Sequence, residues 1–213
     1  MQHDIAGIRK NYSQKTLTES SVDADAILQF DKWWQEATAS GIDEVNAMTL
    51  ATASVDGLPS ARIVLLKGFS NKGFIFFSNY NSYKGKQLAE NPKACLVFFW
   101  KELERQVRIT GIVQKISAGE SDQYFHSRPI GSQIGASISP QSMVIESREW
   151  LEKKYNELEA ASADTIERPG HWGGYIVKPV EVEFWQGRPS RLHDRIQYSL
   201  DENGKWKIER LAP

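Results

Sequence analysis

The chain has 213 residues, a formal net charge of −1 and 40% hydrophobic residues. This length can bury one substantial core, and a charge near zero excludes the strong overall field that attracts nucleic acid or an anionic membrane. The one cysteine, Cys95, excludes an internal disulfide and fits a reducing compartment. Because Cys95 lies within the apolar run 94–100, we expect a buried thiol.

The beginning of the chain indicates no targeting segment. Residues 1–4 lack the charged and then apolar pattern of a signal peptide, and no apolar run reaches the roughly 18 residues that a membrane-spanning helix needs. We therefore expect a cytoplasmic protein with no membrane and no nucleic-acid partner.

Residues 1–22 are polar and aperiodic, which predicts an N-terminal arm. From Asp25 onward, apolar side chains recur every three or four residues, and this spacing predicts a helix with an aspartate as its N-cap. Gly41 can end that helix. The apolar positions of the predicted helix are Ile27, Phe30, Trp33, Trp34 and Ala37.

Strands dominate the middle of the chain. Apolar and β-branched runs, separated by Gly, Asn or charged connections, predict strands at 48–55, 61–66, 73–77, 93–100 and 106–116. Short helices are predicted at 82–90 and 119–127, and a longer one at 146–161. Two further strands at 174–178 and 180–185 flank Pro179, and a last strand covers 205–210.

The connections between successive middle strands are too short for repeated helical crossovers. This argues against a doubly wound parallel sheet and predicts a β-rich α+β fold, with an antiparallel sheet or small barrel and helices packed outside. No repeat or linker-like stretch divides the chain, so we expect one domain at 23–213 behind the arm 1–22.

The segment 184–195 combines arginines with a histidine and a tryptophan. If its second half is extended, Arg191, His193 and Arg195 share one face. Guanidinium groups beside an imidazole suit an anionic, phosphorylated ligand, and the histidine titrates near neutral pH. The alternative is a solvated edge strand whose charges discourage aggregation.

Two earlier segments offer further cations. Arg62 and Lys67 bracket the apolar residues 63–66 and would project from opposite faces of a regular strand. Both reach one ligand only if Lys67 lies past the strand end or a bulge intervenes. Lys84 lies at a strand-to-helix junction, where backbone N–H groups favour phosphate. Each segment alone is equally compatible with solvated charges and an ordinary capped helix.

The segment 124–132 brings a phenol, a guanidinium and a hydroxyl toward a helix end. Tyr124 and Arg128 are four residues apart and so share a helix face, and Ser132 follows after Pro129 has ended the helix. These groups suit a phosphate or an acidic oxygen.

The sequence contains no Walker-type loop, no GxGxxG, no GxSxG and no HExxH, and its histidines lack metal-ligand spacing. Many phosphate-binding groups without an obvious nucleophile or metal site point to a cofactor that brings its own chemistry.

Six segments in this order resemble the pyridoxine/pyridoxamine 5′-phosphate oxidase family, and the similarity extends from about Ile8 to the C-terminal residues 206–213. The six are RIVLLK (62–67), ERQV (104–107), YFHSRP (124–129), SQIGA (132–136), FWQG (184–187) and RLHDR (191–195). The resemblance implies an antiparallel Greek-key split β-barrel that binds FMN, with peripheral helices, and a homodimer with FMN at the subunit interface.

The resemblance also implies a reaction. The enzyme would oxidise pyridoxine 5′-phosphate or pyridoxamine 5′-phosphate to pyridoxal 5′-phosphate, in the biosynthesis and salvage of vitamin B6. Molecular oxygen (O2) would accept the electrons and give H2O2, and the amine substrate would also release ammonia.

The same resemblance assigns roles to single residues and implies no metal. Arg191 and His193 would be catalytic, lying over the pyridine ring, and the arm around residues 9–12 would close over the substrate. FMN would be bound by Arg62, Ile63, Val64, Leu65, Leu66, Lys67, Phe77, Ser78, Tyr83, Lys84, Gln106, Gln141, Ser142, Trp185 and Arg195. The substrate would be bound by Arg9, Tyr12, Lys67, Tyr124, Arg128, Ser132, Arg191 and His193.

Three positions depart from the family pattern. Tyr83 stands where family members carry arginine, Lys10-Asn11 makes the arm less basic, and Val45 replaces a common proline. Two alternatives remain open on the sequence: a related split-barrel flavin reductase, and a non-catalytic protein that binds flavin or pyridoxal phosphate.

Overall fold

The computed structural model describes residues 7–8, 10–161 and 165–213. The helices in this part of the chain are α1 (Ala26–Ala39), α2 (Tyr83–Glu90), α3 (Ala118–His126), α4 (Ile130–Ile138) and α5 (Arg148–Ala161), with 3₁₀ turns η1 (Lys101–Leu103) and η2 (Pro189–Arg191). The strands are β1 (Ala47–Ala53), β2 (Pro59–Leu65), β3 (Gly68–Ser70), β4 (Gly73–Asn79), β5 (Lys93–Trp100), β6 (Arg105–Lys115), β7 (Trp172–Gln186), β8 (Asp194–Leu200) and β9 (Trp206–Leu211).

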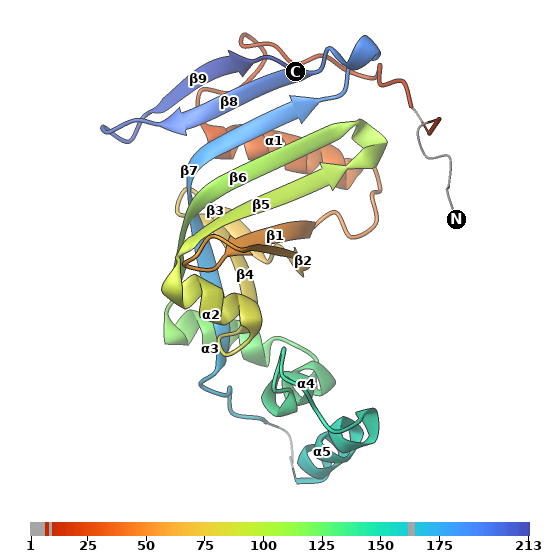
Figure 1. Ribbon diagram of the computed structural model, residues 1–213, viewed down its shortest axis with the longest axis vertical. Helices are drawn as coiled ribbons and strands as arrows, with labels where there is room; N and C mark the ends of the chain where they lie inside the picture. Colours follow the sequence, from red (N-terminus) through yellow and green to blue (C-terminus); the bar gives the residue numbers. More distant parts are fainter. Residues whose placement is uncertain (1–6, 9, 162–164) are drawn as a thin grey trace. The chain divides into compact units, whose positions relative to one another are not determined.

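The strands form one sheet in the order β2-β1-β5-β6-β7-β4-β3, with β8 on β7 and β9 on β8 (Figure 1). The pairs β3·β4, β4·β7, β7·β8 and β8·β9 are antiparallel. These pairings and the separate helices confirm the predicted antiparallel, β-rich α+β architecture.

The chain divides into two compact units. The first unit comprises the segments up to Thr49, Leu96–Thr110 and Pro179–Pro213, and the second comprises Leu50–Cys95 and Gly111–Lys178. Strands β1, β5, β6 and β7 each contribute residues to both units. The single domain at 23–213 stays a prediction.

The core of the first unit forms where α1 packs against strand residues. Asp25 caps the helix by accepting hydrogen bonds from the backbone N–H groups of Ile27 and Leu28. Phe30 is fully buried, and its ring centroid lies 5.3 Å from that of Phe98 and 6.1 Å from that of Trp100. The predicted helix and its apolar face are confirmed, and the apolar contact of this face is what stabilises the helix.

The core of the second unit forms around one buried cluster, which consists of Phe125, Ile134, Ile166 and Trp172. This cluster joins α3, α4 and the beginning of β7. The helix α4 was missing from the prediction, which assigned no element to the residues directly after Pro129. Pro129 does end α3, but with its fixed φ it also serves as the N-cap of α4.

The prediction of two strands on either side of Pro179 is wrong, because β7 runs through it. Its pairing with β4 ends at Val177, and its pairing with β8 begins at Glu181. Pro179 belongs to neither ladder, so its missing N–H costs neither of them a hydrogen bond.

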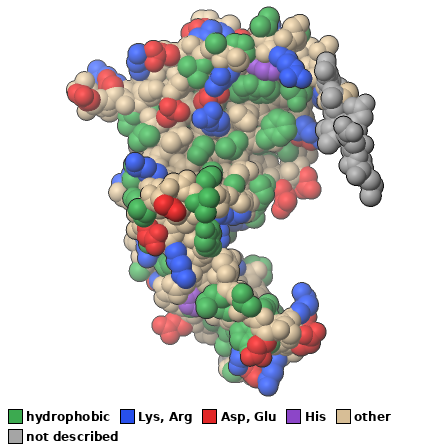
Figure 2. Space-filling view, viewed as in Figure 1, with side chains coloured by type: hydrophobic (Ala, Val, Ile, Leu, Met, Phe, Trp, Pro, Cys, Tyr) green, Lys and Arg blue, Asp and Glu red, His purple; other side chains and the backbone are tan. Residues whose placement is uncertain are grey.

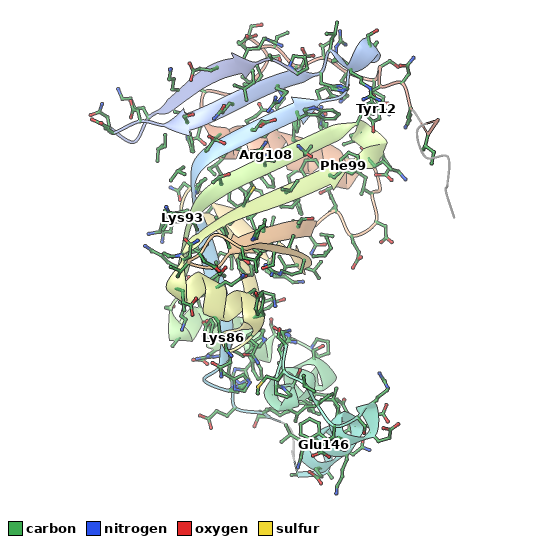
Figure 3. All side chains as sticks on the ribbon, in the orientation of Figure 1. Tyr12, Lys86, Lys93, Phe99, Arg108 and Glu146 are labelled. Atoms are coloured by element: carbon green, nitrogen blue, oxygen red, sulfur yellow. The ribbon has the colours of Figure 1, made fainter. Side chains whose placement is uncertain are left out.

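The prediction that Cys95 is buried is also wrong, since the residue is half-exposed. In β5 the side chains alternate, with Phe98 and Trp100 buried while Phe99 is 54% exposed. Figure 2 shows hydrophobic side chains among charged ones on the face that carries Phe99, and Figure 3 labels Phe99 on β5 and Arg108 on β6. The apolar run 94–100 therefore contributes side chains to both faces of β5, and only one of these faces is fully buried.

Replacing Phe30 with alanine should lower the free energy of unfolding by about 3–5 kcal/mol, because it leaves a cavity among packed rings. Leu28→Ala is the matched control, since Leu28 lies on the same helix but is 57% exposed. Urea denaturation of both variants measures the difference. Equal losses of stability would contradict the packing described for α1.

Candidate functional site

The second unit contains a cavity of about 530 Å³, called here the cationic cavity. It opens beside the ends of β2 and β4, the start of α2 and the α3–α4 junction. Four cations line it, Arg62, Lys67, Lys84 and Arg128, and none of its described lining residues is Asp or Glu. Lys67 lies past the end of β2, which is the condition under which Arg62 and Lys67 were predicted to reach one ligand.

The first pair of these cations is held by neutral acceptors. The Nη1 of Arg62 donates to the hydroxyl of Thr52 at 2.6 Å and to the carbonyl of Leu50 at 3.2 Å. The Nζ of Lys84 donates to the Oε1 of Gln141 at 3.1 Å. Burial lowers the pKa of both cations, and the charge of Arg62 lowers the pKa of Lys84 further. A bound anion would offset the cost of burying these two positive charges.

Arg128 lies just beyond the end of α3. Its Nη2 donates to the carbonyl of Ser132 at 2.8 Å, and its guanidinium carbon lies 4.7 Å from the ring centroid of Trp172. Its Nη1 is buried without a hydrogen-bond partner among the described residues. Burial lowers the pKa of this guanidinium. A buried, unpaired donor on a cation is costly, and an anionic oxygen would satisfy it.

A flat aromatic wall lies beside these cations. The ring of Phe77 stacks on Tyr124 at 3.9 Å between centroids and on Trp172 at 5.4 Å. Ile63, Val64 and Leu65 add apolar lining, and the hydroxyl of Ser78 donates to the Oε1 of Gln141 at 3.3 Å. Apolar walls with convergent cations suit a planar ring that carries a phosphate.

The first unit contains a second cavity, of about 780 Å³, called here the arm pocket. Lys10, Asn11 and Tyr12 of the arm line it, together with residues of and around η2. The latter are Arg188, Ser190, Arg191 and His193, and Ile8 completes the lining.

The imidazole of His193 is oriented by its neighbours in this pocket. Its Nδ1 accepts from the backbone N–H of Arg188 at 3.1 Å, and its ring lies 4.5 Å from Trp185 and 6.1 Å from Tyr12. Burial lowers the pKa of His193, and the charge of Arg191 lowers it further. The structure therefore favours a neutral imidazole that carries its proton on Nε2.

The prediction that Arg191, His193 and Arg195 share the face of one strand is wrong. Ser190 and Arg191 have φ values of 57° and 61°, so the chain turns here, and β8 begins only at Asp194. The Nε and Nη2 of Arg195 bind the carboxylate of Glu183 at 2.9 and 3.1 Å. Arg191 and His193 line the arm pocket, whereas the guanidinium of Arg195 is paired with a buried acid.

Most of the predicted ligand-binding residues of the second unit meet in the cationic cavity. They are Arg62, Ile63, Val64, Leu65, Lys67, Phe77, Ser78, Lys84, Tyr124, Arg128, Ser132 and Gln141. Three others do not line it: Leu66 is buried, while Tyr83 and Ser142 are exposed. Gln106, Trp185 and Arg195 belong to the first unit, and Arg9 lies outside the described residues.

Some lining residues were missed by the sequence analysis. Trp172 supplies part of the aromatic wall from a strand that follows Tyr124 by almost fifty positions, and no local pattern marks it. Asn79 lines the cavity beside the predicted Ser78 and could have been found from its place at the end of β4.

Two family models match the chain. The model described as pyridoxamine 5′-phosphate oxidase matches residues 34–161, and the model of the pyridoxine 5′-phosphate oxidase C-terminal dimerisation region matches residues 172–213. The chain belongs to the pyridoxamine 5′-phosphate oxidase family. The resemblance seen in the sequence motifs is thereby confirmed, and with it the expectation of an enzyme of this family.

Similar proteins extend over the whole chain. The pyridoxine/pyridoxamine 5′-phosphate oxidase of Nostoc punctiforme is 56% identical over 100% of both chains, and that of Salinibacter ruber is 54% identical over 98% of this chain and 99% of its own. The chloroplastic oxidase 1 of Arabidopsis thaliana is 54% identical over 99% of this chain, which spans 41% of that protein.

Solved structures agree with the fold. PhzG from Burkholderia lata, in complex with tetrahydrophenazine-1-carboxylic acid, has a TM-score of 0.89 and 30% identity, over 94% of this chain and 100% of its own. A pyridoxamine 5′-phosphate oxidase-related, FMN-binding protein from Nostoc punctiforme has a TM-score of 0.71 at 16% identity, over 90% of this chain and 100% of its own. The predicted split-barrel fold is confirmed. Among the described residues, no helix is both long and apolar enough to cross a membrane.

The pKa of His193 should lie below that of a free histidine and should rise in the Arg191→Met variant. The substitution removes one nearby positive charge, although the effect of burial remains. An NMR titration of the imidazole Cε1 proton measures both values. The control is Arg148→Met, which makes the same charge change on the exposed face of α5. An unchanged or lowered pKa in Arg191→Met would contradict the arrangement of the arm pocket.

Proposed function

We propose that the protein oxidises pyridoxine 5′-phosphate or pyridoxamine 5′-phosphate to pyridoxal 5′-phosphate. FMN is the cofactor, O2 accepts the electrons to give H2O2, and the amine substrate also releases ammonia. Family membership supports the reaction, since the relatives named for it share more than half of their residues with this chain. The observation that carries the proposal is the cationic cavity, where four cations face no carboxylate among the described lining residues.

The cationic cavity offers enough cations for two phosphate groups. Arg62 and Lys84, at the start of α2, are proposed to bind the phosphate of FMN, and the apolar residues 63–65 with Phe77 to lie along its ring. Lys67, Tyr124, Arg128 and Ser132 are proposed to bind the substrate phosphate. The unpaired Nη1 of Arg128 supports that assignment, because a phosphate oxygen is the acceptor it lacks.

Arg191 and His193 are proposed to act on the pyridine ring of a substrate whose phosphate lies in the cationic cavity of the other subunit of the proposed homodimer. FMN, when bound, supplies the acceptor for the hydride that leaves the substrate carbon C4′. The residues of the chain then position the ring and exclude water, and the neutral His193 offers the proton on Nε2 as a hydrogen-bond donor. The cation of Arg191 can pair with oxygen substituents of the substrate.

A homodimer with FMN at the subunit interface is part of the proposal. The C-terminal match to a dimerisation region supports it, and so does the half-exposed apolar face of β5 with Phe99. Gln106, Trp185 and Arg195 are proposed to contribute to FMN binding from the first unit. Tyr83 is 51% exposed and does not line the cationic cavity, and its contact with FMN stays a prediction. The cytoplasm stays the predicted compartment.

One assay separates the oxidase from its alternatives. The purified protein should show flavin absorbance and should form pyridoxal 5′-phosphate from both phosphorylated vitamers only when O2 is present. A flavin reductase would instead consume NADH or NADPH without forming pyridoxal phosphate. A yellow protein that turns over neither vitamer would contradict the proposal and favour a binding protein.

The variant Arg128→Gln should raise KM for the phosphorylated substrate by about 10-fold to 100-fold, the usual cost of one charge-assisted hydrogen bond. The kcat should change little, because a phosphate contact is made equally in the ground and transition states. Steady-state kinetics with a thermal melt of each variant measures this. Arg148→Gln on the exposed helix α5 is the control. A fall in kcat with an unchanged KM would contradict the phosphate-binding role.

A further inference from the structure

Glu104 is a charged residue in an unusual environment. It follows the turn η1 between β5 and β6, its exposed fraction is 2%, and its backbone is left-handed at φ 55° and ψ 40°. The left-handed conformation is unfavourable for a residue with a Cβ atom, and burial of an isolated carboxylate also destabilises the folded state. Both costs persist only where the surrounding contacts offset them.

The carboxylate of Glu104 binds the N-terminal arm. Its Oε2 accepts hydrogen bonds from the backbone N–H groups of Ser13 at 2.8 Å and of Gln14 at 3.1 Å. Its Oε1 lies 4.0 Å from the Nζ of Lys10. One carboxylate oxygen of Glu104 thus accepts from two consecutive backbone N–H groups of the arm, and the other oxygen faces Lys10, so this side chain is a main attachment of residues 10–14.

The backbone of Glu104 binds the other wall of the arm pocket. Its carbonyl accepts from the N–H of Gly187 at 2.7 Å and from the Nε2 of Gln186 at 3.2 Å. The Oε1 of Gln186 in turn accepts from the Nε of Arg105 at 3.0 Å. One residue thus connects the arm with the strand end that leads into η2, Arg191 and His193.

Tyr12 lies where these two attachments meet. Figure 3 shows it beside the ends of β6 and β7. A Cβ atom on Gly187 would lie 2.7 Å from the Cβ of Tyr12, so the tyrosine packs directly on the glycine backbone. Its ring lies edge-on to Trp185 at 5.9 Å between centroids and at 6.1 Å from His193. Tyr12 can keep this place only while the arm is held.

We propose that Glu104 is a positioning residue that holds the arm closed over the arm pocket and so keeps Tyr12 against His193. The inference rests on the proposed function, in which this pocket takes the pyridine ring of the substrate. When the arm leaves, the carboxylate gains water in place of two N–H donors. The free energy of arm closure is therefore small, because the hydrogen bonds gained are nearly offset by the desolvation of the carboxylate. A small free energy lets the arm open for each substrate.

The arm itself gives the first test, by hydrogen exchange of the ligand-free protein followed by mass spectrometry. Glu104→Gln keeps the shape but removes the charge, and the amides of Ser13 and Gln14 should exchange about tenfold faster. Glu104→Gly should give the same effect, and because glycine favours the left-handed conformation this variant also folds without backbone strain. The matched control, Glu102→Gln, changes an exposed glutamate of the same turn and should leave both amides unchanged.

The second test is kinetic. Glu104→Gln should lower kcat/KM for pyridoxine 5′-phosphate about tenfold in the wild-type background, and less than about twofold in a Tyr12→Ala background, because a residue that acts only through the arm loses its effect once Tyr12 is gone. Glu102→Gln should match the parent enzyme in both backgrounds.

Three results would overturn the inference: unchanged exchange at Ser13 and Gln14, faster exchange with an unchanged kcat/KM, or equal kinetic losses with and without Tyr12. A wild-type protein that oxidises neither vitamer would overturn the proposed function instead. The exchange rates would still decide whether Glu104 holds the arm.

Discussion

The uncompensated charge of the cationic cavity is the constraint on which the functional interpretation depends. Burial disfavours the charged form of Arg62, Lys84 and Arg128, and no carboxylate among the described lining residues offsets that cost. A protein with a net charge of −1 has acids available, so their absence here indicates a ligand that supplies the negative charge. The stacked rings of Phe77, Tyr124 and Trp172 add the flat apolar wall that a heterocycle needs.

The arm pocket differs, since two of its cations, Lys10 and Arg188, face carboxylates, and backbone conformation sets its geometry. Arg188 pairs with Asp194 at 3.3 Å, and its N–H fixes the tautomer of His193. The left-handed residues Ser190 and Arg191 form the turn that places the side chains of Arg191 and His193 in the pocket. Left-handed conformations of residues other than glycine are concentrated at functional sites. Glu104, itself left-handed, joins this turn to the arm. The positions of Arg191 and His193 therefore depend more on the left-handed residues Glu104, Ser190 and Arg191 than on the geometry of a strand.

Local patterns in the sequence predicted most elements within one or two residues, because α1 and the middle strands follow simple periodicities. They offered Arg62, Lys67, Lys84 and Arg128 only as separate candidates, each compatible with solvated charges, and it was the family resemblance that grouped them as ligand-binding residues. They failed where contacts between distant segments determine the structure. Pro179 lies inside β7, between the residues that pair with β4 and those that pair with β8, and η2 turns where an extended segment was assumed. Trp172 and Glu104 reach their sites from distant parts of the chain, and no spacing rule finds such residues.

The most direct measurement of the central claim compares FMN with riboflavin on the apoprotein, by quenching of flavin fluorescence. The two ligands share the ring and differ in the phosphate, so the comparison isolates the contribution of the cations. The account predicts that FMN binds at least about 100-fold more tightly, as expected for more than one charge-assisted contact to a phosphate, and that salt reduces the difference. Equal affinities for FMN and riboflavin would contradict it.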